Sequence, residues 1–477
     1  MLFNSIEFLL FFPIVSIAYY ITPHKFRWLL VLLASCVFYM AFIPIYVLIL
    51  LFTIVIDYFA GILIEQSEGK KRKYYLILSL CANIGVLAYF KYYNFFIENI
   101  NQLLPTGKHF SILTILLPIG LSFHTFQAMS YTIEVYRKKQ KAERHFGYYA
   151  LYVMFYPQLV AGPIERPQNI LYQLHQKHQF NYDRIVSGLR LILWGMFKKT
   201  IIADRMALIA DPAFLKPEYF TGLPLIIATL AFSIQIYCDF SGYTDIAIGT
   251  ARTMGINLMK NFNAPYFSKS IAEFWSRWHI SLSTWFRDYL YIPLGGNRTT
   301  TFKWYRNLML VFLISGFWHG ANWTFIAWGC IHGIYLILSN VFFKNKQKKS
   351  TKIKSAFAVF TTFLLVTFTW IFFRASSIQD AKYIIMHLFD GIQQPIQYIF
   401  KGIIYLKLNK FSPIDFFVLG LSLCILFYVD KNINKISWSN WIKQKNTVVR
   451  WSIYFIMTFL IIAFGIFDNR QFIYFQF

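Results

Sequence analysis

The chain has 477 residues, of which 57% are hydrophobic and only 14% are charged. Soluble globular domains carry about 25% charged residues, so this composition excludes an ordinary soluble fold and predicts a membrane protein. The formal net charge is +25, but the lysines gather in short loops such as 70–73 and 344–354. Basic loops of this kind are typical of the cytoplasmic side of a membrane protein, and nucleic-acid binding is not expected.

Apolar segments of membrane-spanning length recur along the chain. We expect spans at residues 3–21, 28–42, 45–64, 74–97, 112–135, 184–203, 222–250, 305–341, 355–373, 413–430 and 450–467. Two of them, 222–250 and 305–341, are long and interrupted by glycine and polar residues, so each is expected to hold a span plus a broken or re-entrant piece. The sequence therefore predicts an all-α polytopic membrane protein with about eleven transmembrane helices plus re-entrant or interfacial helices.

The basic loops also predict an orientation. The first span, 3–21, lacks a basic leader and a cleavage site, so we expect it to be retained. Placing loops 66–73 and 137–145 in the cytoplasm leaves two spans between them and puts the N-terminus outside. The basic stretches 344–354 and 431–445 are then cytoplasmic, and the C-terminal tail lies outside. We expect a multi-pass protein of the cytoplasmic (inner) membrane.

Residues 262–304 are polar and aromatic at once, so they do not fit an ordinary span. If 273–289 form one helix, His279, Ser283 and Arg287 fall at i, i+4 and i+8 on one face. Charged residues that could neutralise one another lie close by: Glu273, Arg277 and Asp288. The segment either lines a polar cavity or is a structural interfacial helix with a salt-bridge network.

The expected span 305–341 contains His319, which is followed by a glycine and lies near Asn322 and His332. An ionisable residue inside a membrane segment is costly and indicates a functional site by default. Burial favours the neutral imidazole, which can accept a proton as a general base. The alternative is a structural histidine in the core.

Other kinds of catalytic site find little support. The sequence has no His-Glu-x-x-His helix and no Cys/His cluster at ligand spacing, so no metal site is expected. It also lacks the Gly-x-Ser-x-Gly elbow of a serine hydrolase. Asp239 and Asp245 lie in the span 222–250, but they do not share a helical face unless Gly242 breaks the helix. They could bind an amine, orient a histidine from another segment or pair with Arg277 or Arg287, and structural pairing is favoured.

Two segments resemble the signature sequences of the bacterial membrane-bound O-acyltransferases. They read FWSRWHISLSTWFRDYLYIPLGGNR at 274–298 and SGFWHGANWTFIAWGCIHG at 315–333. FSGYTD at 240–245, VAGPIERP at 160–167 and the opening MLFNSIEFLLFF are also similar. The resemblance covers essentially the whole chain, and it is closest to the membrane subunits for O-acetylation of alginate and cell-wall polysaccharides.

The resemblance implies one membrane domain over 1–477, built around a central tunnel, with its catalytic signature region at 262–341. His319 matches the family histidine near the middle of the membrane and is implied as the general base. His279 matches the second family histidine and is expected to assist or orient. The residues expected to bind substrate or shape the tunnel mouth are Trp318, Asn322, Arg277, Ser283, Arg287, Asp288 and Asp245.

Family members move an acyl group from a cytoplasmic thioester toward an acceptor outside, and an extracytoplasmic SGNH-type partner often completes transfer to a polysaccharide. The resemblance therefore implies an acyltransferase, with acetyl as the expected group. Acyl-CoA or another acyl thioester is expected as donor substrate, and no tightly bound cofactor is expected. The D-alanyl transfer proteins of teichoic acid synthesis are the nearest alternative. A non-catalytic transporter or flippase of lipid-linked sugars is a second one, but the inverted repeats that it would show are not evident.

The C-terminal tail, 468–477, ends in the aromatic sequence FIYFQF. It either packs as an apolar tail on the membrane surface or acts in the reaction. It resembles the aromatic C-terminal motif through which this family, or a small partner peptide in the D-alanyl systems, presents a tyrosine to the site. Tyr474 would then relay the acyl group as an ester. A phenol with a pKa of about 10 needs a neighbouring base such as His319 to become a nucleophile.

Overall fold

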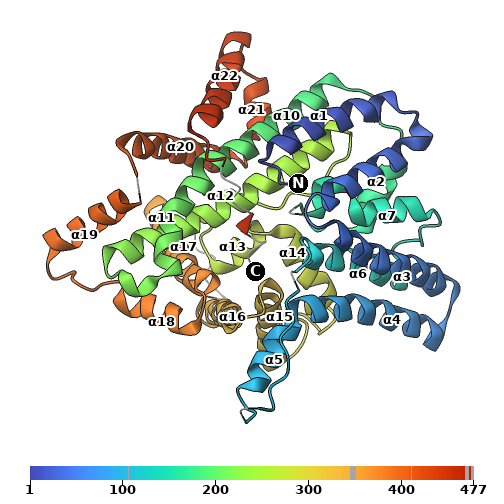
Figure 1. Ribbon diagram of the computed structural model, residues 1–477, viewed down its shortest axis with the longest axis horizontal. Coiled ribbons are helices and arrows are strands. Elements are labelled where there is room, and N and C mark those ends of the chain that lie inside the picture. Colours follow the sequence, from blue (N-terminus) through green and yellow to red (C-terminus); the bar gives the residue numbers. More distant parts are fainter. Residues whose placement is uncertain are drawn as a thin grey trace. The chain divides into compact units, whose positions relative to one another are not determined.

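The computed structural model describes residues 1–105, 107–115, 117–160, 162–343, 351–409, 411–467 and 472–473. Every regular element within these residues is a helix (Figure 1). Among them, seven helical segments are long and apolar enough to cross a membrane: Pro44–Gln66, Gly69–Asn101, Leu223–Thr253, Trp323–Phe342, Lys352–Arg374, Pro413–Asn432 and Thr447–Phe464. The predicted all-helical, multi-pass fold is confirmed, whereas the number of eleven spans stays a prediction.

The chain packs as two compact units. The first contains residues 1–192 and 243–259, and the second contains 193–242 and the described residues from 260 to 473. The helices of the first unit are α1 (Ile6–Ile21), α2 (His24–Met40), α3 (Val47–Gln66), α4 (Gly69–Leu87), α5 (Tyr93–Asn101), α6 (Leu121–Tyr136), α7 (Phe146–Met154), α8 (Tyr156–Leu159) and α9 (Pro167–His175). Two helices contribute residues to both units, α10 (Tyr182–Met196) and α12 (Leu223–Thr253).

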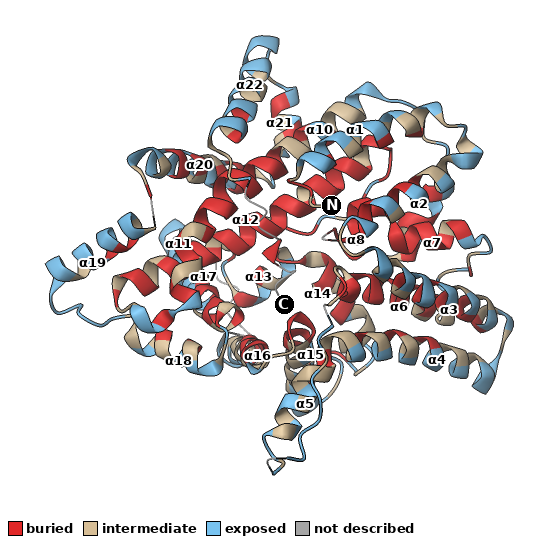
Figure 2. Ribbon diagram, in the orientation of Figure 1, coloured by how far each residue is buried: buried red, intermediate tan, exposed pale blue. Residues whose placement is uncertain are grey.

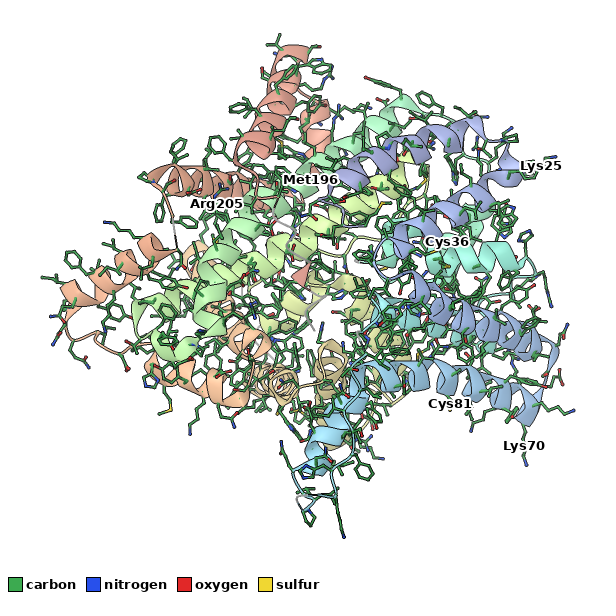
Figure 3. All side chains as sticks on the ribbon, viewed as in Figure 1. Lys25, Cys36, Lys70, Cys81, Met196 and Arg205 are labelled. Carbon is green, nitrogen blue, oxygen red and sulfur yellow. The ribbon has the colours of Figure 1, made fainter. Side chains whose placement is uncertain are left out.

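The second unit holds the segments that matter most for function. Its remaining helices are α11 (Asp204–Leu215), α13 (Ile271–Arg277), α14 (Ile280–Phe286), α15 (Thr301–His319), α16 (Trp323–Phe343), α17 (Lys352–Arg374), α18 (Ile378–His387), α19 (Pro395–Leu408), α20 (Pro413–Asn432), α21 (Trp438–Lys443) and α22 (Thr447–Phe464). Arg205 of α11, labelled in Figure 3, ties three helices together. Its guanidinium donates to Asp415 of α20 at 3.1 Å and to the carbonyl oxygen of Phe464 in α22 at 3.0 Å.

In the first unit, the hairpin of α3 and α4 packs against α6. Asp57 of α3 is fully buried, and its carboxyl group accepts hydrogen bonds from Ser79 Oγ at 2.6 Å and Asn83 Nδ2 at 2.8 Å, both on α4. Hydrogen bonds of this kind hold membrane helices together where no hydrophobic driving force acts between them. The basic residues of loop 66–73 lie at the exposed start of α4, and Lys70 points away from the hairpin (Figure 3).

The predicted interruption of the span 222–250 is wrong. α12 runs through this region without a break, and most of its length is buried (Figure 2). Gly242 serves close packing instead, because a methyl group there would lie 2.9 Å from the carbonyl oxygen of Gly195 in α10. A glycine inside a membrane helix thus lets a neighbouring backbone approach without ending the helix.

The predicted break within 305–341 is confirmed. α15 ends at His319, and α16 begins at Trp323, so the segment forms two helices that pack closely against each other. Their contact depends on two glycines. A methyl group on Gly316 would overlap with the carbonyl oxygen of Phe325, and one on Gly329 would overlap with that of Phe312.

We expect Gly329→Ala to destabilise the protein, because the added methyl group must push α15 and α16 apart. Overpacking of this kind typically costs about 1–3 kcal/mol, which thermal unfolding in detergent would register as a lower midpoint. Gly420→Ala in α20 is the matched control, since no heavy atom lies within 4 Å of its added methyl group. That variant should keep or slightly raise the midpoint, because alanine is the better helix former. Equal midpoints for both variants would contradict the close packing.

Candidate active site

His279 lies at a break between two short helices. α13 ends where Trp278 adopts an extended conformation, and His279 itself has φ 42° and ψ 54°, in the left-handed region. Residues other than glycine are uncommon there, and such strained residues cluster at functional sites. The prediction that His279, Ser283 and Arg287 share one helical face is therefore wrong, because α14 starts only after this turn.

The turn buries His279 completely and places its ring beside Asn261. Nδ1 of His279 lies 3.2 Å from Asn261 Oδ1, and the same oxygen accepts hydrogen bonds from Ser281 N at 3.1 Å and Ser281 Oγ at 2.9 Å. A backbone N–H can only donate, so the Asn261 atom that faces the turn is its oxygen. This oxygen accepts a hydrogen bond from His279 Nδ1, which therefore carries the proton, and Nε2 holds the lone pair. Burial lowers the pKa of His279 to about 3, so the ring is neutral near pH 7.

His319 is the last residue of α15, and the extended backbone of Gly320 ends the helix there. Its side chain is buried among aromatic rings. The centroid of the His319 ring lies 5.1 Å from that of Trp328 and 5.4 Å from that of Phe373. The His279 ring is 6.5 Å away. The structure therefore brings the two histidines together from the ends of different helices.

The third histidine of the region, His332, has a structural environment. Thr369 Oγ1 donates to the carbonyl oxygen of Val366 at 2.7 Å, so it accepts from His332 Nε2, which lies 2.9 Å away. On the other side of the ring, Nδ1 accepts a hydrogen bond from Trp275 Nε1 at 3.3 Å. Both ring nitrogens of a neutral imidazole are thus satisfied, and His332 ties α13, α16 and α17 together.

Ser283 and Arg287 line a cavity of about 490 Å³ that is bounded by residues of α13, α14, α15 and α16. Ser315 also lines it, and this residue precedes His319 by one helical turn on the same face of α15. The cavity thus approaches the histidine pair along α15. All three predicted mouth residues take part in ion pairs with near neighbours. Arg277 pairs with Glu273 at 2.5 Å, and Arg287 pairs with Asp288 at 2.8 Å. A tunnel that reaches His319 stays a prediction.

The other predicted substrate-binding residues lie in different surroundings. The Trp318 ring is buried, with its centroid 6.5 Å from that of His279. Asn322 caps α16, since its Oδ1 accepts from Thr324 N at 3.0 Å. Asp245 is half-buried on the part of α12 that belongs to the first unit. Tyr474 lies outside the described residues. Substrate binding by these side chains stays a prediction.

A buried ion network adjoins the histidines, and sequence analysis missed its central residue, Lys199. This lysine lies in the π-helical stretch η3 (Phe197–Ala203). Its Nζ is 2.7 Å from Asp239 Oδ1 and 2.8 Å from Asp204 Oδ1, and the three side chains are at most 4% exposed. The predicted pairing of Asp239 is confirmed, but its partner is a lysine. The available signal was a lysine inside the expected span 184–203, since charges in membrane segments are costly.

The same network holds the described part of the C-terminal tail, Phe472 and Ile473. The backbone N–H of Ile473 donates to Asp239 Oδ2 at 2.8 Å. Phe472 is fully buried, and its ring centroid lies 5.5 Å from that of Phe240, which in turn lies edge-on to His279 at 4.6 Å. These two tail residues are therefore inside the second unit, separated from His279 by the ring of Phe240, and not on the membrane surface.

These features define a class of protein, a multi-pass helical membrane protein with a buried pair of histidines that is suited to proton transfer. Among the described residues, no group of three or more potential metal ligands gathers. The chain belongs to the membrane-bound O-acyltransferase family, whose family model matches residues 16–378. It is therefore an O-acyltransferase, as predicted, and the transporter alternative is not supported.

Curated relatives agree with this assignment. The chain is 42% identical over 387 residues to "Probable alginate O-acetylase AlgI" of Pseudomonas aeruginosa, which covers 80% of this chain and 73% of the relative. It is 38% identical over 414 residues to the peptidoglycan O-acetyltransferase of Helicobacter pylori, covering 80% and 78% of the two chains. The teichoic acid D-alanyltransferase of Bacillus subtilis is 30% identical over 273 residues, with 54% of this chain and 68% of the relative covered.

Proposed function

We propose that this enzyme moves an acetyl group from a cytoplasmic thioester across the inner membrane, for O-acetylation of an exported or cell-envelope polysaccharide. The observation that carries the proposal is the buried pair of His319 and His279, whose rings lie 6.5 Å apart. The acetyl group and the polysaccharide are inferred from the two relatives that match 80% of this chain, an alginate O-acetylase and a peptidoglycan O-acetyltransferase.

In the proposed reaction, His319 accepts the proton of the acceptor hydroxyl while the oxygen attacks the thioester carbonyl. The carbon–sulfur bond then breaks, and the departing thiolate takes the proton from the imidazolium, so His319 is restored. Two features support this role. The position of His319 at the C-terminal end of α15 stabilises the positive charge of the imidazolium through the helix dipole. The surrounding aromatic rings exclude water, which strengthens electrostatic interactions in the site.

His279 is proposed to assist this transfer. Asn261 fixes its proton on Nδ1, so Nε2 can accept a hydrogen bond from the acceptor hydroxyl or from the His319 ring. Because His279 is neutral near pH 7, it can orient these groups without adding a second positive charge beside the imidazolium of His319. The strained turn at residue 279 would keep the ring in place during the reaction.

The remaining parts of the proposal concern delivery. The donor, acyl-CoA or another acyl thioester, would enter from the cytoplasm through the cavity lined by Ser283, Arg287 and Ser315. Tyr474 would carry the acyl group as an ester, which the buried neighbouring residues Phe472 and Ile473 support. An extracytoplasmic SGNH-type partner would complete transfer to the polysaccharide, with the N-terminus and the tail outside.

Deleting the gene tests the proposal. We expect the deletion strain to lose ester-linked acetate from one isolated envelope or exported polysaccharide, and plasmid-borne wild-type protein to restore it. Mild alkaline hydrolysis followed by chromatography of the released acids measures both acetate and D-alanine. Unchanged acetate in every polysaccharide fraction, together with loss of ester-linked D-alanine, would overturn the acetyl assignment in favour of teichoic acid D-alanylation.

A further inference from the structure

A groove of about 930 Å³ lies in the second unit and is lined by residues of α12, α17 and α20. On α17 it follows a single helical face from Lys352, the first residue of the helix, to Phe363. At 1.5 Å per residue this face is about 16 Å long. One leaflet of a bilayer has a hydrocarbon depth of about 15 Å, half of the whole core. The length of the groove along α17 therefore matches the hydrocarbon depth of one leaflet, so the groove can hold one lipid acyl chain.

The walls of the groove are apolar and open toward the surface. Phe360 of α17 and Phe427 of α20 line it and are 58% and 47% exposed. The inner wall is closed by two buried or half-buried aromatic side chains, Tyr237 of α12 and Tyr266. In a bilayer, exposed phenylalanine side chains face lipid tails, so a chain can enter the groove sideways from the membrane.

Two lysines line the groove at helix ends that the charge bias predicts to be cytoplasmic. Lys352 begins α17 and Lys431 lies next to the end of α20, and both are exposed and line the groove. The acidic residue beside them, Asp430, is buried, and its carboxylate accepts a hydrogen bond from Tyr237 Oη at 2.7 Å. Among the described residues that line the groove, the accessible charges are therefore the two ammonium groups, which suit a phosphate.

We propose that this groove binds one anionic glycerophospholipid. Its phosphate lies between Lys352 and Lys431, and one acyl chain follows α17 toward Phe363. Lys352 belongs to the basic stretch 344–354 and Lys431 to the stretch 431–445, so the lipid belongs to the leaflet that the charge bias predicts to be cytoplasmic. A zwitterionic lipid would bring its own positive charge to the lysine pair and bind less well.

The bound lipid would also support the active site. The ring centroids of Tyr237 and Tyr266, which close the groove, each lie 6.2 Å from that of Trp278, the residue before His279. A lipid chain against this wall would keep Trp278 packed and thus help to maintain the strained turn. The support of the active site by the lipid rests on the proposed function, whereas lipid binding itself does not.

Native mass spectrometry tests the lipid site directly. The purified protein is incubated in mild detergent with equal amounts of phosphatidylglycerol and phosphatidylcholine that carry the same chains. We expect the wild type to retain phosphatidylglycerol preferentially. The double variant Lys352→Gln/Lys431→Gln should lose roughly five-fold in retention for each lysine removed. Ala356→Trp, which places a bulky ring in the groove, should abolish retention of both lipids.

The matched control is Lys354→Gln/Lys435→Gln, which removes two exposed lysines of the same region that do not line the groove. It should retain phosphatidylglycerol like the wild type. Equal retention of the two lipids by the wild type, or an equal loss in the control, would overturn the proposal. Acyl transfer in phosphatidylglycerol vesicles is measured for the same variants. If the variants lose lipid retention but keep the wild-type rate of acyl transfer, the lipid site is supported and its effect on the histidine pair is contradicted.

Discussion

Replacing His319 with alanine is expected to lower acyl transfer by about 10²–10⁴-fold, the range typical for loss of a general base. The physical reason is that the variant lacks the imidazole that is proposed to take the proton of the acceptor hydroxyl. The protein should still insert and accumulate, because the rings that surround His319 remain. Ester-linked acyl groups on the polysaccharide, divided by the amount of folded protein from size-exclusion chromatography, provide the measurement.

His332→Gln is the matched control for this experiment. His332 is buried in the same pair of helices, but both of its ring nitrogens are engaged by Thr369 and Trp275. Glutamine can keep part of this hydrogen bonding, so the variant should unfold at a lower temperature and retain most of the activity per folded molecule. If His319→Ala kept more than about a tenth of the wild-type activity, His319 would not be the base. An equal loss of activity in both variants would also contradict the assignment, because His319 would then not differ from a structural histidine.

Much of the fold could be predicted because a bilayer imposes strict rules on sequence. A spanning helix needs about 20 consecutive apolar residues, and this requirement located α12, α17 and α20 to within a few residues. The break before α16 was predictable too, because Gly320 and Asn322 follow His319 directly. At Gly242, by contrast, the predicted break was wrong, because this glycine packs against a neighbouring helix. Sequence alone does not tell a glycine that ends a helix from one that admits a neighbouring backbone.

The candidate site was predictable only in part. The motifs identified His279 and His319, but the turn at His279 was not visible in them, because its partner Asn261 lies earlier in the chain and no glycine marks the position. The ion network was missed for a similar reason. Lys199 and Asp239 come from separate helices, so neither local spacing nor helical periodicity could pair them. Contacts between distant segments decide both features.

Tyr474→Phe is expected to eliminate acyl transfer, since it removes the oxygen that would carry the acyl group and keeps the aromatic ring. The described part of the tail supports this. The Ile473 backbone is anchored to Asp239, and Phe472 packs on Phe240, which contacts His279. Consecutive Cα atoms are about 3.8 Å apart, so Tyr474 starts within one residue of this anchor.

The variant Tyr454→Phe is the control, because this tyrosine lies in α22, outside the tail, and its replacement removes the same oxygen. It should transfer acyl groups at the wild-type rate. In the wild type, mass spectrometry of the C-terminal peptide should find an acyl adduct on Tyr474 that hydroxylamine removes. Full activity of Tyr474→Phe would mean that the tail only fills space or docks a partner beside the histidines. In that case the acceptor hydroxyl must come from another molecule, and His319 would remain the base that activates it.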